Sequence, residues 1–187
     1  MTTRHPLLPL AAALLLFAAC GGKTQQFAAA DGSVKASFNE RSGKWTLSGP
    51  DGKAPVDQYD SMRVVEVSPD GHPMTVVYYN GNTQHWLQYY SSMKKRSEGL
   101  LVDGRREGRW VFFHPNGTVQ AEGTFVNGRE DGPYRVLRDN GAPFYIGQYS
   151  NGVPTGTWEF YDPNGNLVGT KSYDTNGNLV SSSDPDR

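Results

Sequence analysis

The sequence predicts an all-β protein in which tandem hairpins pair in order into an elongated antiparallel β-meander, a single twisted or curled sheet. A segment that opens with Gly-x-Trp or Gly-x-Tyr and closes with Asn-Gly begins at Gly108 and returns at Gly132 and Gly156, so its step is constant. Large apolar residues stand two apart within each copy, and no helical periodicity follows residue 19. Fixed periods of this length are typical of repeat architectures, and an alternation of two is typical of strands.

Residues 1–19 are predicted to be a lipoprotein signal peptide. Arg4 and His5 precede an apolar run that is too short to span a bilayer as a helix. The run ends in Leu-Phe-Ala-Ala-Cys20, which resembles the lipobox of bacterial lipoproteins and implies cleavage before Cys20 and lipidation of this residue. A plain secretory signal is the alternative. Cys20 is the only cysteine of the chain, so no disulfide is expected within it.

A short flexible tether is predicted over residues 20–26, which begin with the lipidated Cys20 and continue in small and polar residues. Position 21 is not Asp, which resembles the sorting pattern of outer-membrane lipoproteins. We therefore expect a lipid-anchored protein of the cell envelope, on the outer membrane and facing the periplasm if the source has two membranes.

Residues 27–183 are predicted to be one repeat domain, because the register of the clear repeats continues upstream. Trp86 precedes Trp110 by the same step, and the step shortens at Val64 and again at Trp45. One hairpin buries too little surface to offset the entropy of ordering its backbone. Neighbouring hairpins must then share a structural core, for which we expect the recurring residues Trp45, Trp86, Trp110, Tyr134, Trp158, Phe125, Tyr149 and Tyr173.

Within a copy, alternation assigns each side chain to one face of the sheet. Trp158 and Phe160 share one face and Glu159 lies on the other. Asn164-Gly165 is predicted to turn the chain as a type I′ turn, because both central residues of that turn need positive φ.

The repeated pattern resembles the MORN-repeat variant of bacterial proteins, including those called YwqK-like antitoxins. The resemblance is strong over residues 99–177 and weaker over 27–98. It implies an elongated meander of hairpins, a role in binding or scaffolding, and no set of catalytic residues. The antitoxin label implies a cytoplasmic protein, whereas the lipobox-like start indicates the envelope. Cell-wall-binding repeats also combine Gly-Trp with Asn-Gly turns, but their period is shorter and their aromatic triplets are tighter.

Catalytic and metal-binding patterns are missing from the sequence, so we expect no enzyme, no cofactor and no metal. His72, His85 and His114 fall in different repeats, without the spacing of metal ligands. The net charge of −1 gives no electrostatic reason to expect nucleic acid. Carboxylates at 98 and 122 recur at the repeat step and are expected in one column of the sheet. Ile146 and Thr170 break this column of carboxylates, so a solvated face is expected rather than a site.

Two features are candidates for a binding surface. Phe113, Leu137 and Tyr161 alternate to the face opposite the tryptophans, so the sheet either curls on itself, which we take as the first expectation, or uses this stripe as a contact surface. A basic cluster at one end of the middle repeats contains Arg105, Arg106 and Arg109. The alternative is that these residues belong to a solvated face of mixed charge.

These observations favour a non-enzymatic, lipid-anchored envelope protein whose repeat sheet mediates protein binding or scaffolding. The expected partners are the membrane, through the anchor at Cys20, and a protein of unknown identity. An antitoxin or immunity-type neutraliser of a toxin, or a module that binds cell-wall glycan, are the alternatives.

Overall fold

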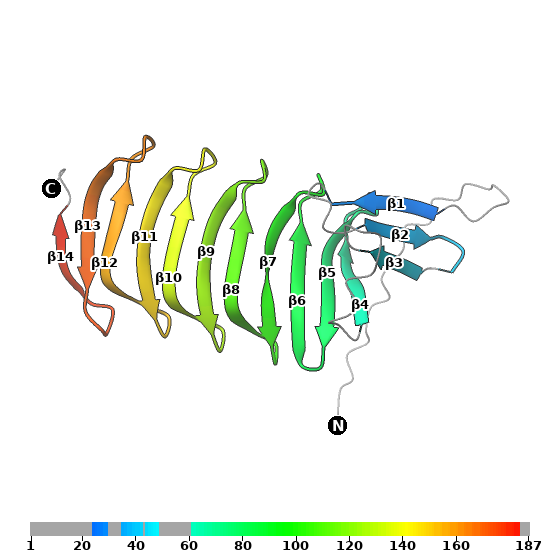
Figure 1. Cartoon of the computed structure of the whole chain (residues 1–187), viewed down its shortest axis with the longest axis horizontal. Helices are drawn as coiled ribbons and strands as arrows, with labels where there is room; N and C mark the ends of the chain where they lie inside the picture. The colour runs from blue at the N-terminus through cyan, green and yellow to red at the C-terminus, as the bar shows by residue number, and fades with distance from the viewer. Residues whose placement is uncertain (1–23, 30–34, 43, 49–60, 184–187) are drawn as a thin grey trace, which may run out of the picture.

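The protein consists of strands and turns throughout the part described by a computed structural model, which covers residues 24–29, 35–42, 44–48 and 61–183 (Figure 1). The signal peptide, Cys20 and most of the tether fall outside this part. Within these residues, fourteen strands form an eleven-stranded sheet and a separate three-stranded sheet. The prediction of an all-β antiparallel meander is confirmed, although the first three strands do not continue it.

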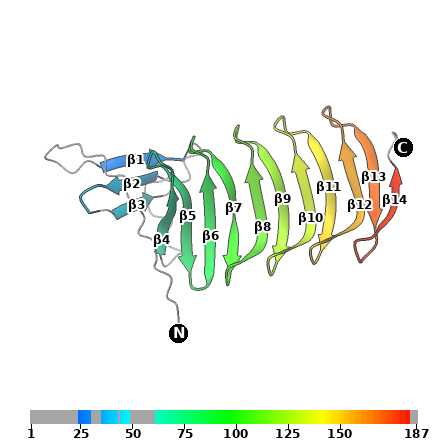
Figure 2. The ribbon, with the colours of Figure 1, turned by 180° about the vertical axis from the view of Figure 1, so that it is seen from behind.

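The large sheet contains the strands β4 to β14, and each pairs antiparallel with the strand before and after it. Its strands are β4 (Ser61–Val67), β5 (Pro73–Asn80), β6 (Thr83–Tyr89), β7 (Lys95–Val102), β8 (Arg105–Phe113), β9 (Val119–Val126), β10 (Arg129–Leu137), β11 (Pro143–Ser150), β12 (Val153–Tyr161), β13 (Leu167–Tyr173) and β14 (Leu179–Ser183). Its order follows the chain, and β4 and β14 lie at opposite ends in both views (Figures 1 and 2). The sheet therefore stays open and does not curl on itself to cover both faces.

Two kinds of turn alternate along the meander. At one edge Asn127-Gly128 turns the chain with φ angles of 51° and 86°, the two positive values of a type I′ turn. At the other edge the prediction of this turn type at Asn164-Gly165 is wrong, because only Gly165 has a positive φ there. That connection is longer. In it the backbone N–H of Asp162 donates a hydrogen bond to Asn166 O, and that of Gly165 donates to Asp162 O.

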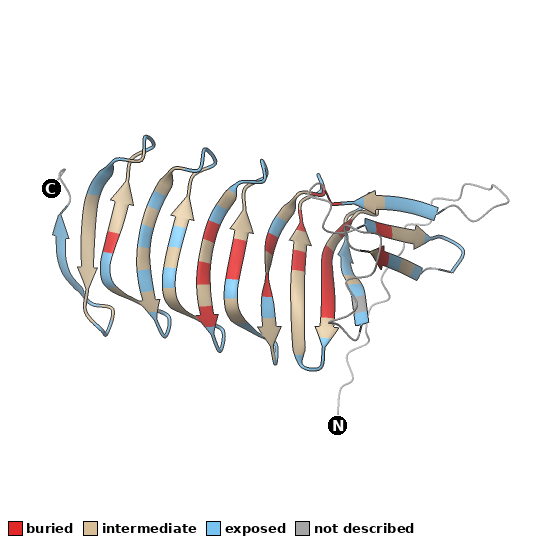
Figure 3. Ribbon diagram, viewed as in Figure 1, coloured by how far each residue is buried: buried red, intermediate tan, exposed pale blue. Residues whose placement is uncertain are grey.

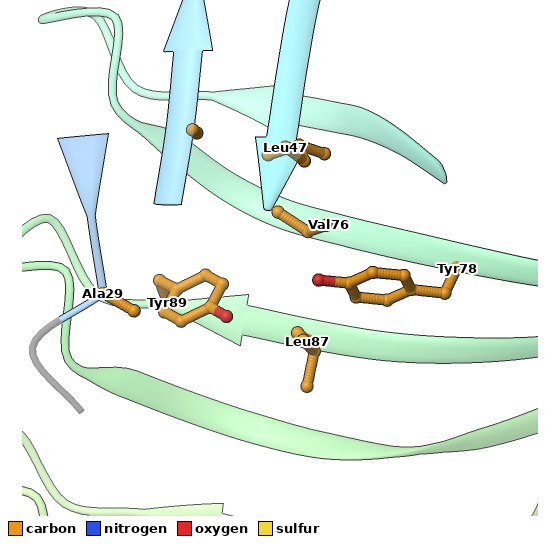
Figure 4. Packing of buried hydrophobic residues seen from close by; sticks show 7 residues of the cluster. Ala29, Leu47, Val76, Tyr78, Leu87 and Tyr89 are labelled. Atoms are coloured by element: carbon orange, nitrogen blue, oxygen red, sulfur yellow. The ribbon is translucent and has the colours of Figure 1, made fainter. Parts of the chain in front are cut away.

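The three-stranded sheet, β1 (Thr24–Ala28), β2 (Lys35–Asn39) and β3 (Lys44–Ser48), packs against one face of β4 to β6. β1 starts inside the segment predicted as the tether, so residues 24–26 belong to the folded part. Trp45 lies in β3 and packs beside Phe27 at 5.6 Å between ring centroids, so it stands outside the row of the other tryptophans. Figure 4 shows the shared core, made by Ala29, Ala36, Leu47, Val76, Tyr78, Leu87 and Tyr89.

Burial declines from this double-layered end toward the C-terminus (Figure 3). Trp110, Phe125 and Trp158 of the predicted repeat core are buried, with 3–5% of their surface exposed. The other members in the large sheet are half-buried, and these are Trp86, Tyr134, Tyr149 and Tyr173. Every residue of β14 is exposed. The repeats thus form a single layer over β7–β14, whose two faces are covered only by their own side chains among the described residues.

Candidate binding faces of the sheet

Register divides the large sheet into two faces with different chemistry. The first, here called the tryptophan face, carries a row in which aromatic residues and glycines alternate from β6 to β12: Trp86, Gly99, Trp110, Gly123, Tyr134, Gly147 and Trp158. The second, here called the charged face, carries an unbroken row of cross-strand partners from β4 to β14: Val64, Val76, Leu87, Glu98, Val111, Glu122, Arg135, Ile146, Glu159, Thr170 and Ser183. Glu98 and Glu122 therefore share one row, as predicted, and Ile146 and Thr170 occupy the equivalent positions in the later repeats.

In this row, the rings of Trp110, Tyr134 and Trp158 each lie directly over a glycine of the preceding strand. A methyl group added at Gly99 would lie 2.3 Å from the Trp110 ring, and one at Gly147 would lie 2.2 Å from the Trp158 ring. No side chain fits in this space, so the strand glycines are required for packing rather than for turning. From the sequence, a conformational role had been assigned only to the turn glycine Gly165.

The predicted basic cluster is divided between the two faces. The Arg106 guanidinium lies over the Trp110 and Phe125 rings of the tryptophan face, at 4.7 and 5.2 Å from their centroids. Arg109 instead forms an ion pair with Glu122 on the charged face. Arg105 lies beside Gly128 in the neighbouring turn. The three arginines therefore do not form one basic patch.

The predicted stripe of Phe113, Leu137 and Tyr161 belongs to the charged face. Lys95 Nζ forms a salt bridge with Glu98 Oε2 at 2.9 Å and lies 5.8 Å from the centroid of the Phe113 ring. The Tyr161 hydroxyl donates to Glu159 Oε2 at 2.6 Å, which places this ring on the side of Glu159. All three members of the stripe are half-buried.

A shallow hollow of about 170 Å³ lies around Glu122 on the charged face. Arg109 and Arg135 both bind the carboxylate, and Arg135 Nε lies 2.5 Å from Oε1. Burial would raise the pKa of Glu122, but the hydrogen bonds and charges of the two arginines outweigh it and hold the pKa below its usual value. Exposed Ile146 lines the same hollow. The two arginine cations exceed the single Glu122 anion in number and lie beside apolar surface, an arrangement suited to binding. The residues that line the hollow include no paired nucleophile and base.

Side chains that differ between repeats join the repeats along one edge. Each donates to a backbone carbonyl 23 residues ahead, in the next copy, at 2.7–3.0 Å: Tyr90 Oη to Phe113, His114 Nε2 to Leu137 and Arg138 Nη2 to Tyr161. The sequence carries no signal for these bonds beyond the spacing, because the three donors are chemically unlike. Three different side chains thus donate a hydrogen bond to the carbonyl at the equivalent position of successive repeats.

Tyrosines gather on the tryptophan face of the last repeats. Tyr149 lies between Tyr134 and Trp158, with ring centroids 5.4 and 4.9 Å away. Burial raises the pKa of both Tyr134 and Tyr149. Trp110 donates its indole N–H to Leu100 O at 2.9 Å, whereas Trp158 Nε1 is buried without a hydrogen-bond partner among the described residues.

The three histidines in the described part of the chain lie in separate places. His72 stacks edge-on against Phe27, His114 joins two repeats, and burial lowers the pKa of His85 although Glu98 opposes the shift. Residues 24–29, 35–42, 44–48 and 61–183 contain no group of three or more His, Cys, Asp or Glu that could hold a metal ion. Within the same residues, no helix is long and apolar enough to cross a membrane.

Comparison with known proteins finds a repeat family that is similar to part of the chain. The family model described as the MORN repeat variant matches residues 106–127 and 154–174. No curated protein matches the chain. Among solved structures, a mutant of S. aureus TarM in complex with Fondaparinux, alpha-GlcNAc-glycerol and UDP matches at 10% identity and a TM-score of 0.32, over 71% of this chain and 21% of its own. A second TarM structure matches at 9% identity and a TM-score of 0.24, over 84% and 20%. The chain thus spans about a fifth of the length of these structures.

Proposed function

We propose that this is a MORN-repeat protein and that it is a non-enzymatic binding protein, held at the cell envelope by a lipid on Cys20, whose charged face binds a protein partner. MORN repeats are in general modules that bind proteins or membranes. The repeat match supports the binding role. The lipobox-like sequence before Cys20 supports the location.

One observation carries the proposal: the charged face is covered at one end and open over the rest. Over β4–β6 the three-stranded sheet buries Val76 and Leu87 of the row completely or nearly so, at 0% and 6% exposed. Further along the same row no described element lies on the sheet, and Ile146 is 36% exposed between Arg135 and Glu159. Arginine is enriched at protein interfaces, which combine an apolar centre with a polar rim, so an apolar Ile146 beside Arg135 on an open sheet suits a protein interface.

Photo-crosslinking in membranes tests the proposal. A photoreactive residue at Ile146 should capture a protein, which mass spectrometry of the adduct identifies. The matched control places the same residue at Lys171, which lies on the tryptophan face and should give no adduct. Equal capture from both positions, or none from Ile146, would refute a binding role for the charged face.

The anchor is tested separately. Cys20→Ser should block lipidation and move the protein out of the membrane fraction, since Cys20 is the only cysteine available for acylation. A wild-type protein that already fractionates away from membranes would contradict the anchor while leaving the binding face untouched.

The two alternatives predict other results. A glycan-binding module would be retained on purified peptidoglycan and released when Phe113 and Tyr161 are mutated together. An antitoxin would have a toxin encoded beside it, and its deletion would have a phenotype only when that toxin is present.

A further inference from the structure

The charged face of β10–β12 has a pattern that complements itself. Five residues, here called the β11 patch, make it up: Arg135, Leu137, Ile146, Glu159 and Tyr161. Arg135 and Glu159 flank Ile146 as its cross-strand partners on either side. Leu137 and Tyr161 each lie two residues further along the same flanking strands. The patch is therefore basic and apolar on one side of β11, and acidic and apolar on the other.

A two-fold axis lying above Ile146 and parallel to β11 would match these two sides. Such an axis places β10 of one copy over β12 of the other, because it reverses the order of strands and keeps positions along them. Arg135 of each copy then faces Glu159 of the other copy, and Leu137 of each copy faces Tyr161 of the other. Ile146 meets its own counterpart on the axis, as an isologous interface requires.

The charges select this axis over the other one in the plane of the sheet. An axis perpendicular to the strands would set each strand over itself, so Arg135 would face Arg135 and Glu159 would face Glu159. Like charges placed opposite each other in an interface disfavour association. Only the axis along β11 pairs every charge of the patch with its opposite.

The side chains concerned can make these contacts. Arg135 has 46% of its side chain exposed, and its guanidinium has five N–H donors, of which Nε binds Glu122. The Glu159 carboxylate accepts the Tyr161 hydroxyl on Oε2, and a carboxylate has further lone pairs for a guanidinium. The same face already packs against a second sheet over β4–β6, so sheet-on-sheet packing is a contact that this surface makes within one chain.

We propose that a second copy of this chain binds the β11 patch, face to face about a two-fold axis parallel to β11. This inference rests on the proposed function, because it names the partner of the charged face. Dimerisation would pair two lipid-anchored chains on one membrane and leave the tryptophan faces of both outward.

Cysteine crosslinking of the full chain in membranes tests the axis itself. Ile146→Cys should form a disulfide-linked dimer under mild oxidation, because only residues on the axis meet their own copies. Thr170→Cys is the matched control, since Thr170 lies in the same row but two strands from the axis and would face Glu122. The wild-type chain, with Cys20 alone, gives the background. Equal dimer yields from both variants, or none from Ile146→Cys, would overturn the proposal.

Charge reversal in the Ile146→Cys background tests the pairing. Arg135→Glu or Glu159→Arg alone should lower the dimer yield by about tenfold or more, because each places like charges together twice. The double reversal should restore the dimer, and so should coexpression of the two single variants as a mixed dimer. Arg105→Glu, the same change outside the β11 patch, should have no effect. Failure of both rescues would overturn the proposal, whereas a photo-adduct between Ile146 and a different protein would reject the dimer and keep the proposed function.

Discussion

Adding one methyl group at Gly123 should destabilise the protein only while the Tyr134 ring is present. A Cβ at Gly123 would lie 2.3 Å from Tyr134 Cδ2 and 2.8 Å from Cε2, far inside van der Waals contact. Displacing a packed ring typically costs about 1–3 kcal/mol. Alanine is favoured over glycine within a strand by roughly 0.5–1 kcal/mol, which offsets part of that cost. Gly123→Ala should therefore lower the free energy of unfolding by about 1–2 kcal/mol.

The sign of the effect should reverse when the ring is removed. In a Tyr134→Ala background nothing remains for the new methyl group to displace, so Gly123→Ala should stabilise by about 0.5–1 kcal/mol. A double-mutant cycle measured by urea unfolding and tryptophan fluorescence then gives a coupling of roughly 1.5–3 kcal/mol. If Gly123→Ala costs the same in both backgrounds, the ring does not set the glycine requirement and our account of the tryptophan face is wrong.

Three further perturbations test the packing and the electrostatics. Trp110→Ala, at a buried position in the middle of the row, should lower the free energy of unfolding by about 3–5 kcal/mol. Tyr173→Ala, at a half-buried position near the end of the sheet, should lower it much less. Equal losses in melting temperature would contradict a core whose burial declines along the sheet. Arg106→Leu should cost about 0.5–1 kcal/mol by removing a cation from three rings, and a neutral result in urea unfolding would reject that contact. Burial lowers the pKa of His85, with Glu98 opposing, so the unfolded state binds the proton more readily. The free energy of unfolding should then fall as the pH drops below about 6.5, and His85→Gln should flatten that dependence.

The candidate site could be predicted only in part. Alternation correctly put Phe113 and Tyr161 on the face opposite the tryptophans. The same rule separates Arg106 from Arg109, since even and odd positions of a strand point to opposite faces, but closeness in sequence groups them wrongly. The self-complementary β11 patch depends on which residues become cross-strand partners, and irregularities shift that register by one residue between β10 and β11 and by two between β11 and β12.

The sequence by itself determined the hairpin repeat, the order of the strands and the aromatic row, because each follows from a local period of two within the longer, constant step of the repeat. Only the tertiary structure decided where the first hairpins go. The alternation of apolar and polar residues in β1–β3 is compatible with strands that extend the edge of the large sheet and equally with strands that pack across its face. The second arrangement is the one that buries Val76, Tyr78 and Leu87 beneath a second layer. That choice covers one end of the charged face and leaves the part around Ile146 open, which is the physical basis of the functions proposed for it.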